Sequence, residues 1–454
     1  MLDQTPSRVL RDFLGFGNAS SFIEESRLFR GFAGLLSRVR LSMVSSETIS
    51  AWGRALLVLL LFSCLFIPRF AIGSITSSYQ VDLRTEDLLL LVIGVLLLWV
   101  MTGKKDPRPT YHGPREKFFV GRFSQSFLWF LLACEISILN GMIFRTIDKP
   151  LLSFLYLLKW VEYFLVFLAT AYFAVTSKDS VFFLKVFFLL GIAAAGYGWW
   201  EHLFPAVKAV YPNYYRLYER APFHGDANHI GGFLVLWIGF FTGIFLKTES
   251  TRTRSLLLAA LAFVFFPFIW TYSRKSYFAL AGALAFPFLF RGVQKKTLFL
   301  ISSLIILAFF FPTRLSERLI DLGEAFSSTD PFHSSWAGNW VMWKESLWNF
   351  DKFFLFGSGF GSRHRLFYES QYILVLAETG IFGALAFLMM GVNLVRQVWS
   401  WLDQGVAFGW LIGFVGFLIH NASCVTWTVS KAAIPFWFLT ATTLAYLRQR
   451  ENAA

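Results

Sequence analysis

Long apolar segments alternate with short polar connections along most of the chain. Lipid offers no partner to an unpaired backbone N–H or C=O group, so each apolar segment is predicted to be a helix. A helix needs ~20 apolar residues to cross a bilayer. Twelve segments approach this length, near residues 55–72, 87–103, 124–143, 151–175, 181–200, 229–246, 255–271, 276–291, 297–311, 372–396, 406–423 and 431–447. The pattern predicts an all-α, polytopic membrane protein with about twelve transmembrane helices.

One polar connection is much longer than the others. It covers residues 312–369, between the ninth and tenth apolar segments, and is predicted to be one large external loop. Loops held by a rigid scaffold carry a large share of binding and catalytic residues. We therefore expect this loop to contribute chemistry or a partner site, with a purely structural cap as the alternative.

Composition supports the membrane class, and charge orients the helices. Hydrophobic residues make up 56% of the chain and charged residues 15%. Soluble domains carry about 25% charge, so a soluble enzyme with a single anchor is excluded. The formal charge is +13, and the basic residues gather in alternate connections: Lys104, Lys105, Arg108, Arg115, Lys117, Arg122, Lys247, Arg252, Arg254, Arg291, Lys295, Lys296, Arg396, Arg448 and Arg450.

The positive-inside rule then places these basic connections and both termini in the cytoplasm. The connections at 201–228, 272–275 and 312–369 fall on the external side. Anionic lipid is the partner expected for the excess positive charge, and nucleic acid is not implied.

Three divisions of the chain follow from this pattern. Residues 1–54 form a basic cytoplasmic segment, residues 55–447 the transmembrane domain, and residues 448–454 a cytoplasmic tail. Within the first, residues 20–44 have the spacing of an amphipathic helix on the inner leaflet, with a disordered basic tail as the alternative. No internal repeat is visible, which argues against a transporter built from two similar halves. Three cysteines show no metal or disulfide spacing.

A short basic patch, residues 272–276, separates the seventh and eighth apolar segments. Arg274 offers a planar fork of N–H donors, which suits a phosphate or pyrophosphate at the membrane boundary. The alternative is an interfacial arginine that snorkels to water. Earlier in the chain, Lys159 and Glu162 lie three residues apart on one helix face and can pair. Ionisable groups inside a span indicate a functional role, with structural pairing as the equal alternative.

A second patch, residues 221–232, opens the sixth apolar segment. His224, Asp226, Asn228 and His229 crowd a glycine-rich helix start, where free backbone N–H groups suit anions. His224, Asp226 and His229 also suggest a metal site, but the ligands are few and no second cluster matches them, so we predict no metal.

A third patch ends the long loop. His364 or Glu369 is a candidate general base towards a sugar hydroxyl, and Arg363 and Arg365 are candidates for holding an anionic carrier. A solvated charged rim is the alternative. The glycines of 357–361 do not form a phosphate loop, because no Lys-Ser/Thr follows them.

These patches, in this order, resemble the O-antigen ligase and O-antigen polymerase superfamily of bacterial envelopes. The motifs that carry the resemblance are Leu158-Lys-Trp-Val-Glu-Tyr-Phe164, Asp226-Ala-Asn-His-Ile-Gly-Gly232, Ser273-Arg274, Leu355-Phe-Gly-Ser-Gly-Phe-Gly361 and Tyr372-Ile-Leu-Val-Leu-Ala-Glu-Thr-Gly-Ile-Phe-Gly383. The last of these is the most specific. Two positions depart from the family pattern. Glu369-Ser370 stand where ligases usually carry His-Asn, and the arginine expected a few residues before Trp343 is missing or is replaced in space by Arg363 or Arg365.

The resemblance implies an inner-membrane glycosyltransferase that moves a glycan from undecaprenyl pyrophosphate to a sugar hydroxyl on the periplasmic side. The acceptor would be another lipid-linked repeat for a polymerase or a lipid A-core for a ligase, and the Glu-Ser pair favours a polymerase. We assign to Arg274 the stabilisation of negative charge on the leaving pyrophosphate, with help from Arg363 and Arg365. Asn228 and His224 are further substrate contacts.

The general base would be Glu369, with His364 as the second candidate. No metal or cofactor is required. The alternatives are a flippase or solute permease with the loop as a gate, and a non-enzymatic scaffold of a polysaccharide assembly system.

Overall fold

The computed structural model describes residues 46–67, 70–76, 79–102, 114–204, 217–218, 227–290, 294–309, 341, 343–345, 350–362 and 369–451. The amphipathic helix predicted at 20–44 and most of the loop predicted at 312–369 lie outside these residues.

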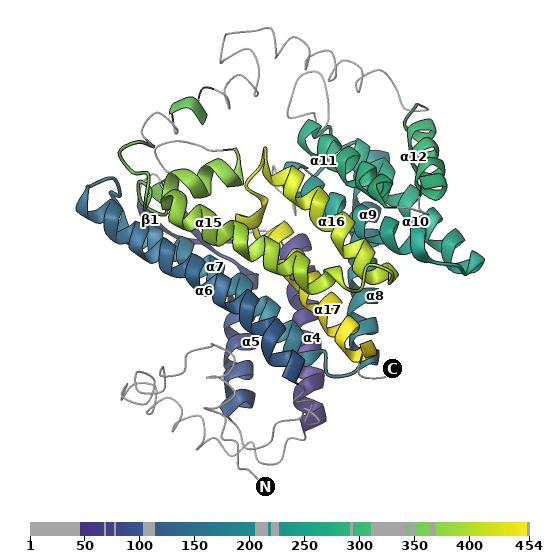
Figure 1. The fold of residues 1–454 in the computed structure, drawn as a ribbon, viewed down its shortest axis with the longest axis horizontal. Coiled ribbons are helices and arrows are strands. Elements are labelled where there is room, and N and C mark those ends of the chain that lie inside the picture. Colours follow the sequence, from purple (N-terminus) through teal and green to yellow (C-terminus); the bar gives the residue numbers. More distant parts are fainter. Residues whose placement is uncertain are drawn as a thin grey trace.

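Twelve α-helices make up almost all of the described part of the chain, and each corresponds to one predicted apolar segment (Figure 1). They are α4 (Ser46–Phe66), α5 (Thr85–Thr102), α6 (Pro114–Ile143), α7 (Pro150–Phe173), α8 (Ser177–Leu203), α9 (Ala227–Lys247), α10 (Thr251–Ile269), α11 (Arg274–Ala285), α12 (Gln294–Phe309), α15 (Gln371–Trp399), α16 (Gly405–Asn421) and α17 (Ser430–Glu451). Helix α4 begins before residue 55 and α17 ends after residue 447, so both helices run past the predicted domain limits.

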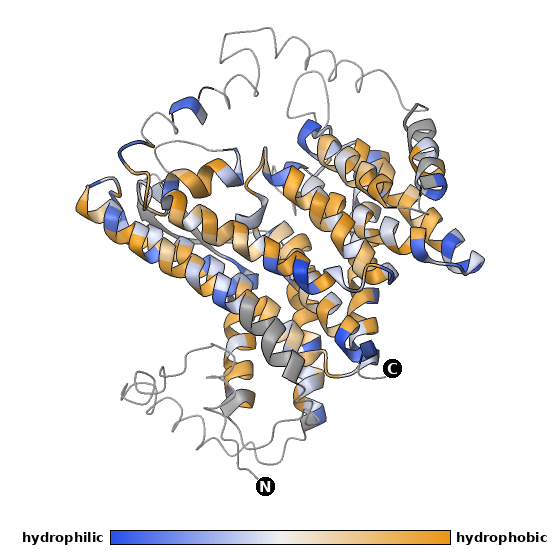
Figure 2. Cartoon of the chain, viewed as in Figure 1, coloured by the Kyte–Doolittle hydropathy of each residue, from blue (hydrophilic) through white to orange (hydrophobic). Residues whose placement is uncertain are grey.

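The helices are those of a multi-pass membrane protein. Seven of them among the described residues, α4, α6, α7, α8, α9, α10 and α15, are long and apolar enough to cross a bilayer. Helix α16 is apolar but shorter. Figure 2 shows hydrophobic residues along the middle of the bundle and hydrophilic ones mainly near helix ends. The helical membrane fold is thus confirmed, while the count of twelve crossings stays a prediction.

A short hairpin between α4 and α5 was not predicted. Strands β1 (Phe70–Thr76) and β2 (Tyr79–Leu83) pair antiparallel, where the first apolar segment was expected to continue to residue 72. Pro68 disfavours helical backbone at the residue before it, which accounts for the end of α4 at Phe66. The helix instead begins nine residues earlier than expected, at Ser46.

Helix α9 forms the centre of the bundle, where nearly all of its side chains are buried. It packs against α16 through paired glycines. A Cβ atom at Gly239 would come within 2.8 Å of the Cα atom of Gly413, and one at Gly243 would clash with Gly409. Small residues let two membrane helices approach closely and gain packing contacts. This contact fixes the N-terminal end of α9 beside the C-terminal end of α16.

Helix α15 is broken at Gly380, which has φ 64° and ψ −167°. The break frees backbone groups that lipid could not satisfy. The segment 353–362 supplies their partners: the N–H groups of Ile381 and Phe382 donate to the carbonyls of Phe354 and Leu355. The end of the long loop is therefore fastened into a membrane helix.

The same segment also binds the helix on the other side of the break. The N–H group of Ser358 donates to the Ala377 carbonyl at 2.9 Å, and that of Gly359 to the Glu378 carbonyl at 3.2 Å. Gly357 and Gly359 have φ of +73° and +117°, values that glycine adopts without steric cost. The glycine motif of the sequence thus builds this loop.

Candidate functional site

The site is built around the N-terminus of α11. Ser273 caps the helix, and its Oγ atom accepts a hydrogen bond from the N–H group of Ser276. Such a cap satisfies one of the free donors of the first turn. The tight connection from α10 places Tyr272 in the left-handed region with φ 48°. Arg274 and Lys275 are therefore the first two residues of a helix, where the helix dipole is positive.

A buried chain of hydrogen bonds links this N-terminus to α9 and α16. Ser273 Oγ donates to Asn228 Oδ1 at 2.9 Å, and Ser276 Oγ donates to Ser273 Oγ at 2.8 Å. Ser276 Oγ also lies 3.1 Å from His420 Nε2, and His420 Nδ1 lies 2.7 Å from Thr426 Oγ1. Ser276, His420 and Thr426 are fully buried. Since a buried polar group is costly without a partner, the chain fixes these side chains relative to one another.

Two glycines of α9 make room for this chain. A Cβ atom at Gly231 would clash with Ser276 Oγ, and one at Gly232 would lie 3.0 Å from the ring of His420. The glycine-rich start of this helix was interpreted as an anion site. Its observed effect is to let the Ser276 and His420 side chains approach the backbone of α9.

The turn after α16 is held by Asn421. Its Oδ1 atom accepts the N–H groups of Thr426 and Trp427 at 3.0 and 3.2 Å, and its Nδ2 group donates to the Phe417 carbonyl at 2.6 Å. These bonds shape the short 3₁₀ helix Thr426–Thr428. The Thr426 hydroxyl is thereby presented to His420.

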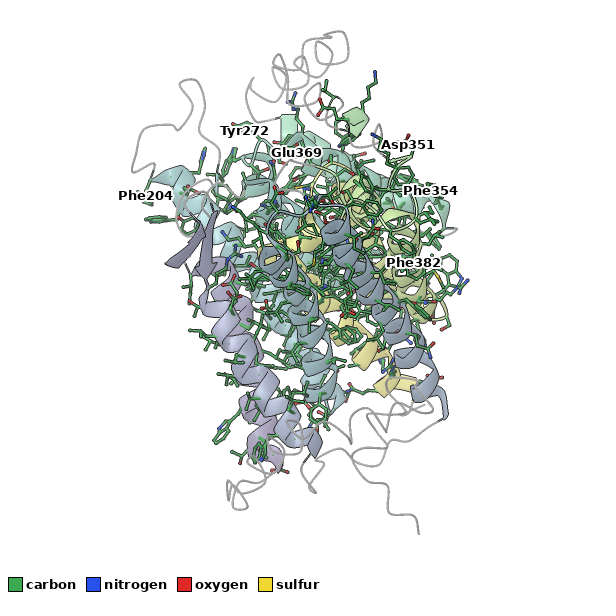
Figure 3. All side chains as sticks on the ribbon, turned by 90° about the vertical axis from the view of Figure 1, so that its left-hand side faces the viewer. Phe204, Tyr272, Asp351, Phe354, Glu369 and Phe382 are labelled. Carbon is green, nitrogen blue, oxygen red and sulfur yellow. The ribbon has the colours of Figure 1, made fainter. Side chains whose placement is uncertain are left out.

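An ion pair joins the start of α11 to the start of α15. Lys275 Nζ binds Glu369 Oε2, and the two side chains are 15% and 25% exposed. Ser370 follows Glu369 and caps α15, because its Oγ atom accepts the N–H group of Ile373. The Glu369 carboxylate thus lies where the long loop ends and α15 is about to begin, beside the basic N-terminus of α11. Figure 3 shows Tyr272 and Glu369 at the same end of the bundle.

The thiol of Cys424 also lies at this corner. Burial raises the pKa of Cys424, but His229 and Lys275 nearby, with hydrogen bonds from His229 and Thr426, lower it below its ordinary value overall. Nearby positive charge and hydrogen bonds to the thiolate both act in this direction. The corner formed by α9, α11, α15 and the turn after α16 therefore suits an anionic group.

A family comparison identifies part of this arrangement. Residues 256–388 match the family model described as O-antigen ligase. This segment of the chain is therefore similar to the O-antigen ligase family. The matched segment runs from α10 to α15 and includes Arg274, Lys275, Glu369 and the broken helix. No curated protein matches the chain significantly.

The match confirms the resemblance found in the sequence. Members of the O-antigen ligase family are glycosyltransferase-like ligases that act on lipid-linked glycans at a membrane, and the match supports an enzyme of this coarse class.

The fold brings three of the predicted site residues to one corner. Asn228 binds Ser273, Arg274 follows it, and Glu369 binds the next residue, Lys275. The other four, His224, Arg363, His364 and Arg365, lie outside the described residues, as does Asp226. Among the described residues no group of three His, Cys, Asp or Glu side chains is placed to hold a metal ion. The roles of all seven residues stay predictions.

Sequence reasoning gave no role to Lys275, His420 or Thr426. Lys275 stood beside Arg274 in the basic patch, and His420-Asn421 end an otherwise apolar segment, which was the available signal. A polar pair at the end of a membrane helix does not reveal its partner. His420 and Ser276 are 144 residues apart, so only the fold shows that they meet.

A second polar network lies between α5, α7 and α17. Lys159 Nζ binds Glu162 at 2.7 Å, as the spacing predicted, and also binds Asp87. Arg84 donates to Ser430 Oγ at 2.9 Å, and Ser430 donates to Glu86 at 2.9 Å. Basic and acidic side chains alternate in this network. Through Ser430, this network binds the N-terminus of α17 to the start of α5, close to the turn that contains Thr426.

Proposed function

We propose that this protein transfers a glycan from undecaprenyl pyrophosphate to a sugar hydroxyl at the periplasmic side of a bacterial inner membrane. One observation carries the proposal: inside the ligase-family segment, a carboxylate and two basic residues meet at a helix N-terminus. The reaction needs a proton acceptor and a positive charge, and the carboxylate and the basic residues provide one each. The carboxylate can accept a proton, and the basic residues can stabilise a leaving pyrophosphate.

The reaction is a displacement at the anomeric carbon of the donor. The acceptor oxygen forms the new glycosidic bond as its proton passes to the Glu369 carboxylate. The bond from the anomeric carbon to the pyrophosphate oxygen breaks, and the carrier leaves with the electron pair. Arg274 and Lys275 stabilise the charge that develops on this oxygen, assisted by the positive end of α11.

The ion pair also suggests how the site is held before substrate arrives. Lys275 and Glu369 neutralise each other across the gap between α11 and α15. An incoming pyrophosphate competes for Lys275, because a phosphate oxygen is a strong partner for an ammonium group. Its binding leaves the carboxylate free to accept a proton.

The remaining assignments rest on the sequence. Arg363 and Arg365 help to bind the pyrophosphate, and Asn228 and His224 contact the substrate. His364 is the second candidate for the general base. Glu369-Ser370 favours a polymerase over a ligase, although Ser370 also has a structural role as the cap of α15. No metal is required, since arginine and lysine supply the positive charge.

Complementation of a knockout tests the proposal. The gene is restored as wild type, Arg274→Ala or Glu369→Gln at matched membrane levels, and surface and lipid-linked glycans are separated on a gel. We expect wild type alone to restore long polysaccharide, while both variants accumulate single lipid-linked repeats. Arg252→Ala, an exposed arginine near the start of α10, is the matched control and should behave as wild type.

Other outcomes separate the alternatives. Repeats that are polymerised but stay on the carrier in the knockout indicate a ligase. If both variants restore polysaccharide as well as wild type does, the site assignment is wrong, and a permease or a scaffold becomes the better account.

A further inference from the structure

The motif Leu158–Phe164 of α7 presents two pairs of side chains to the rest of the bundle. Lys159 and Glu162 form the charged pair, and Trp160 and Tyr163 form an aromatic pair. The members of each pair are three residues apart, so they are neighbours on the helix surface. The charged pair belongs to the second polar network, while the aromatic pair has no part in the site described above.

The aromatic pair contacts the turn between α16 and α17, residues 422–429. The hydroxyl of Tyr163 donates to the Thr428 carbonyl at 3.0 Å. The ring of Trp160 stacks on the ring of Trp427, with centroids 6.2 Å apart and an interplanar angle of 24°. All three side chains, Trp160, Tyr163 and Trp427, are only 1% exposed. Helix α7 therefore binds this turn at two successive residues.

The charged pair reaches the same turn by way of α5 and α17. Lys159 binds Asp87 of α5. The neighbouring Glu86 accepts a hydrogen bond from Ser430, the first residue after the turn, at 2.9 Å. Arg84 donates to the same Ser430 hydroxyl at 2.9 Å. The contacts thus form a closed circuit from α7 to α5, α17, the turn and back to α7. Because a buried polar group is costly without its partner, this circuit resists displacement of the turn.

The position of the turn matters for the polar corner, because the turn contains Thr426. The Thr426 hydroxyl lies 2.7 Å from His420 Nδ1, and His420 Nε2 lies 3.1 Å from Ser276 Oγ. Ser276 in turn binds Ser273, which caps α11. A displaced turn would therefore disturb the start of α11. A misplacement of ~1 Å far from the reacting atoms can slow an enzyme about 100-fold.

We propose that Tyr163 and Ser430 are positioning residues for glycan transfer. They hold the turn 422–429 so that Thr426 keeps His420, and through it the N-terminus of α11, in place for the reaction. The proposal rests on the proposed function for the identity of the reaction. It gives the aromatic half of the α7 motif a role that neither a lipid contact nor a membrane anchor would have.

A matched pair of tyrosine variants tests the proposal. Tyr163→Phe removes the hydrogen bond to the turn. Tyr218→Phe is the control, because Tyr218 is also buried and donates to the Ala194 carbonyl at the same 3.0 Å, away from the turn. Both variants lose one hydrogen bond to a backbone carbonyl, so we expect similar falls in unfolding temperature.

A serine pair repeats the test and serves if Tyr163→Phe does not fold. Ser430→Ala breaks the circuit at the N-terminus of α17. Ser180→Ala is its control, since Ser180 Oγ donates to Gln449 near the other end of α17 at 2.8 Å. Both serines are buried.

The first readout is steady-state transfer by the full chain in vesicles. We expect kcat to fall about fivefold or more in Tyr163→Phe and Ser430→Ala, the order of one hydrogen bond lost from the transition state. Donor KM and both controls should stay within about twofold of wild type. Thr426→Val should lower kcat too, and adding Tyr163→Phe to it should cause little further loss, because the two residues act through one chain.

The second readout is the reactivity of Cys424, which lies inside the turn, in a chain whose other two cysteines are replaced by alanine. His229 of α9 and Lys275 of α11 help to lower the pKa of this thiol. A turn displaced from these helices loses that effect, so the pKa should rise. We expect the midpoint of the pH profile for reaction with methyl methanethiosulfonate to move upwards in Tyr163→Phe and Ser430→Ala, and to stay at the wild-type value in both controls.

Three results would each overturn the proposal: kcat in Tyr163→Phe and Ser430→Ala within about twofold of their controls, independent losses in the double variant with Thr426→Val, or an unchanged Cys424 midpoint in both variants. The thiol reaction requires no glycan transfer. A shifted midpoint in a protein that transfers no glycan would therefore refute the proposed function alone. Transfer that depends on Glu369 but is the same in Tyr163→Phe and Tyr218→Phe would refute the positioning role alone.

Discussion

At the scale of single residues, the charged side chains depend on uncharged ones for their position. Arg274 and Lys275 stand at the start of α11 because Ser273 caps it, and Ser273 is held by Asn228 and Ser276. His420 completes the chain from α16 and is fully buried. It has no access to a substrate outside the bundle, so we interpret it as a positioning residue.

Replacement of His420 tests this interpretation. His420→Ala would remove one hydrogen bond each from the buried hydroxyls of Ser276 and Thr426, which costs about 1 kcal/mol per bond. We expect a lower unfolding temperature in detergent and a loss of about tenfold in kcat, with donor KM little changed. His420→Gln keeps hydrogen-bonding groups at this place and should recover part of kcat. Equal kcat in His420→Ala and wild type would contradict a positioning role.

At the scale of elements, the broken helix α15 joins the long loop to the membrane domain. The loop segment 353–362 binds the backbone on both sides of Gly380, so the loop cannot leave without exposing those groups to lipid. Glu369 immediately precedes the first half of α15, and the second half lines an apolar groove together with α16. The break thus connects the polar corner to the apolar groove.

Gly380→Ala should disrupt this connection. Gly380 has φ 64°, and an added Cβ atom would lie 2.5 Å from the backbone of Leu355. Strain of this kind costs about 1–3 kcal/mol before the clash is counted, so we expect the midpoint of thermal unfolding to fall and activity to be lost. Gly196→Ala, in the open middle of α8, should instead be neutral or raise stability by up to about 1 kcal/mol. If both variants unfold alike, the account of the break is wrong.

At the scale of the whole molecule, the number of crossings determines which face the site occupies. Positive connections alternate along the sequence, and the twelve helices of the described part follow the same order. By length and composition seven of these helices qualify as spans, and α11 has only 12 residues. If each of the seven helices from α4 to α10 crosses the membrane, the corner of Arg274 and Glu369 lies on the side opposite the N-terminus, and an even total number of crossings puts both termini on one side.

Labelling of single cysteines measures this arrangement. Glu249→Cys lies in the exposed connection between α9 and α10, and Asp351→Cys in the exposed end of the long loop. The native cysteines are buried and should contribute only background. We expect a membrane-impermeant maleimide to label Asp351→Cys in intact spheroplasts and Glu249→Cys only after lysis. The reverse pattern would place the site in the cytoplasm.

How much the sequence could predict depends on the range of each interaction. Helix positions follow from local apolar runs, and these were found one for one. The hairpin at 70–83 was missed because its strands are short and adjoin an apolar run. Lys275 and Glu369 are 94 residues apart, and their pairing requires α11 and α15 to start at the same corner. The glycines of 357–361 were visible as a motif, but their role depends on the break at Gly380, which no local pattern reveals.

The most direct test of the central claim is glycan transfer by the purified protein in vesicles, with a lipid-linked glycan as donor. The account predicts transfer by wild type and by Arg252→Ala. It predicts a loss of at least about 100-fold in kcat for both Arg274→Ala and Glu369→Gln, since a general base and a charge stabiliser each contribute at this order. Transfer by either variant within about threefold of wild type would contradict the claim that this corner carries the chemistry.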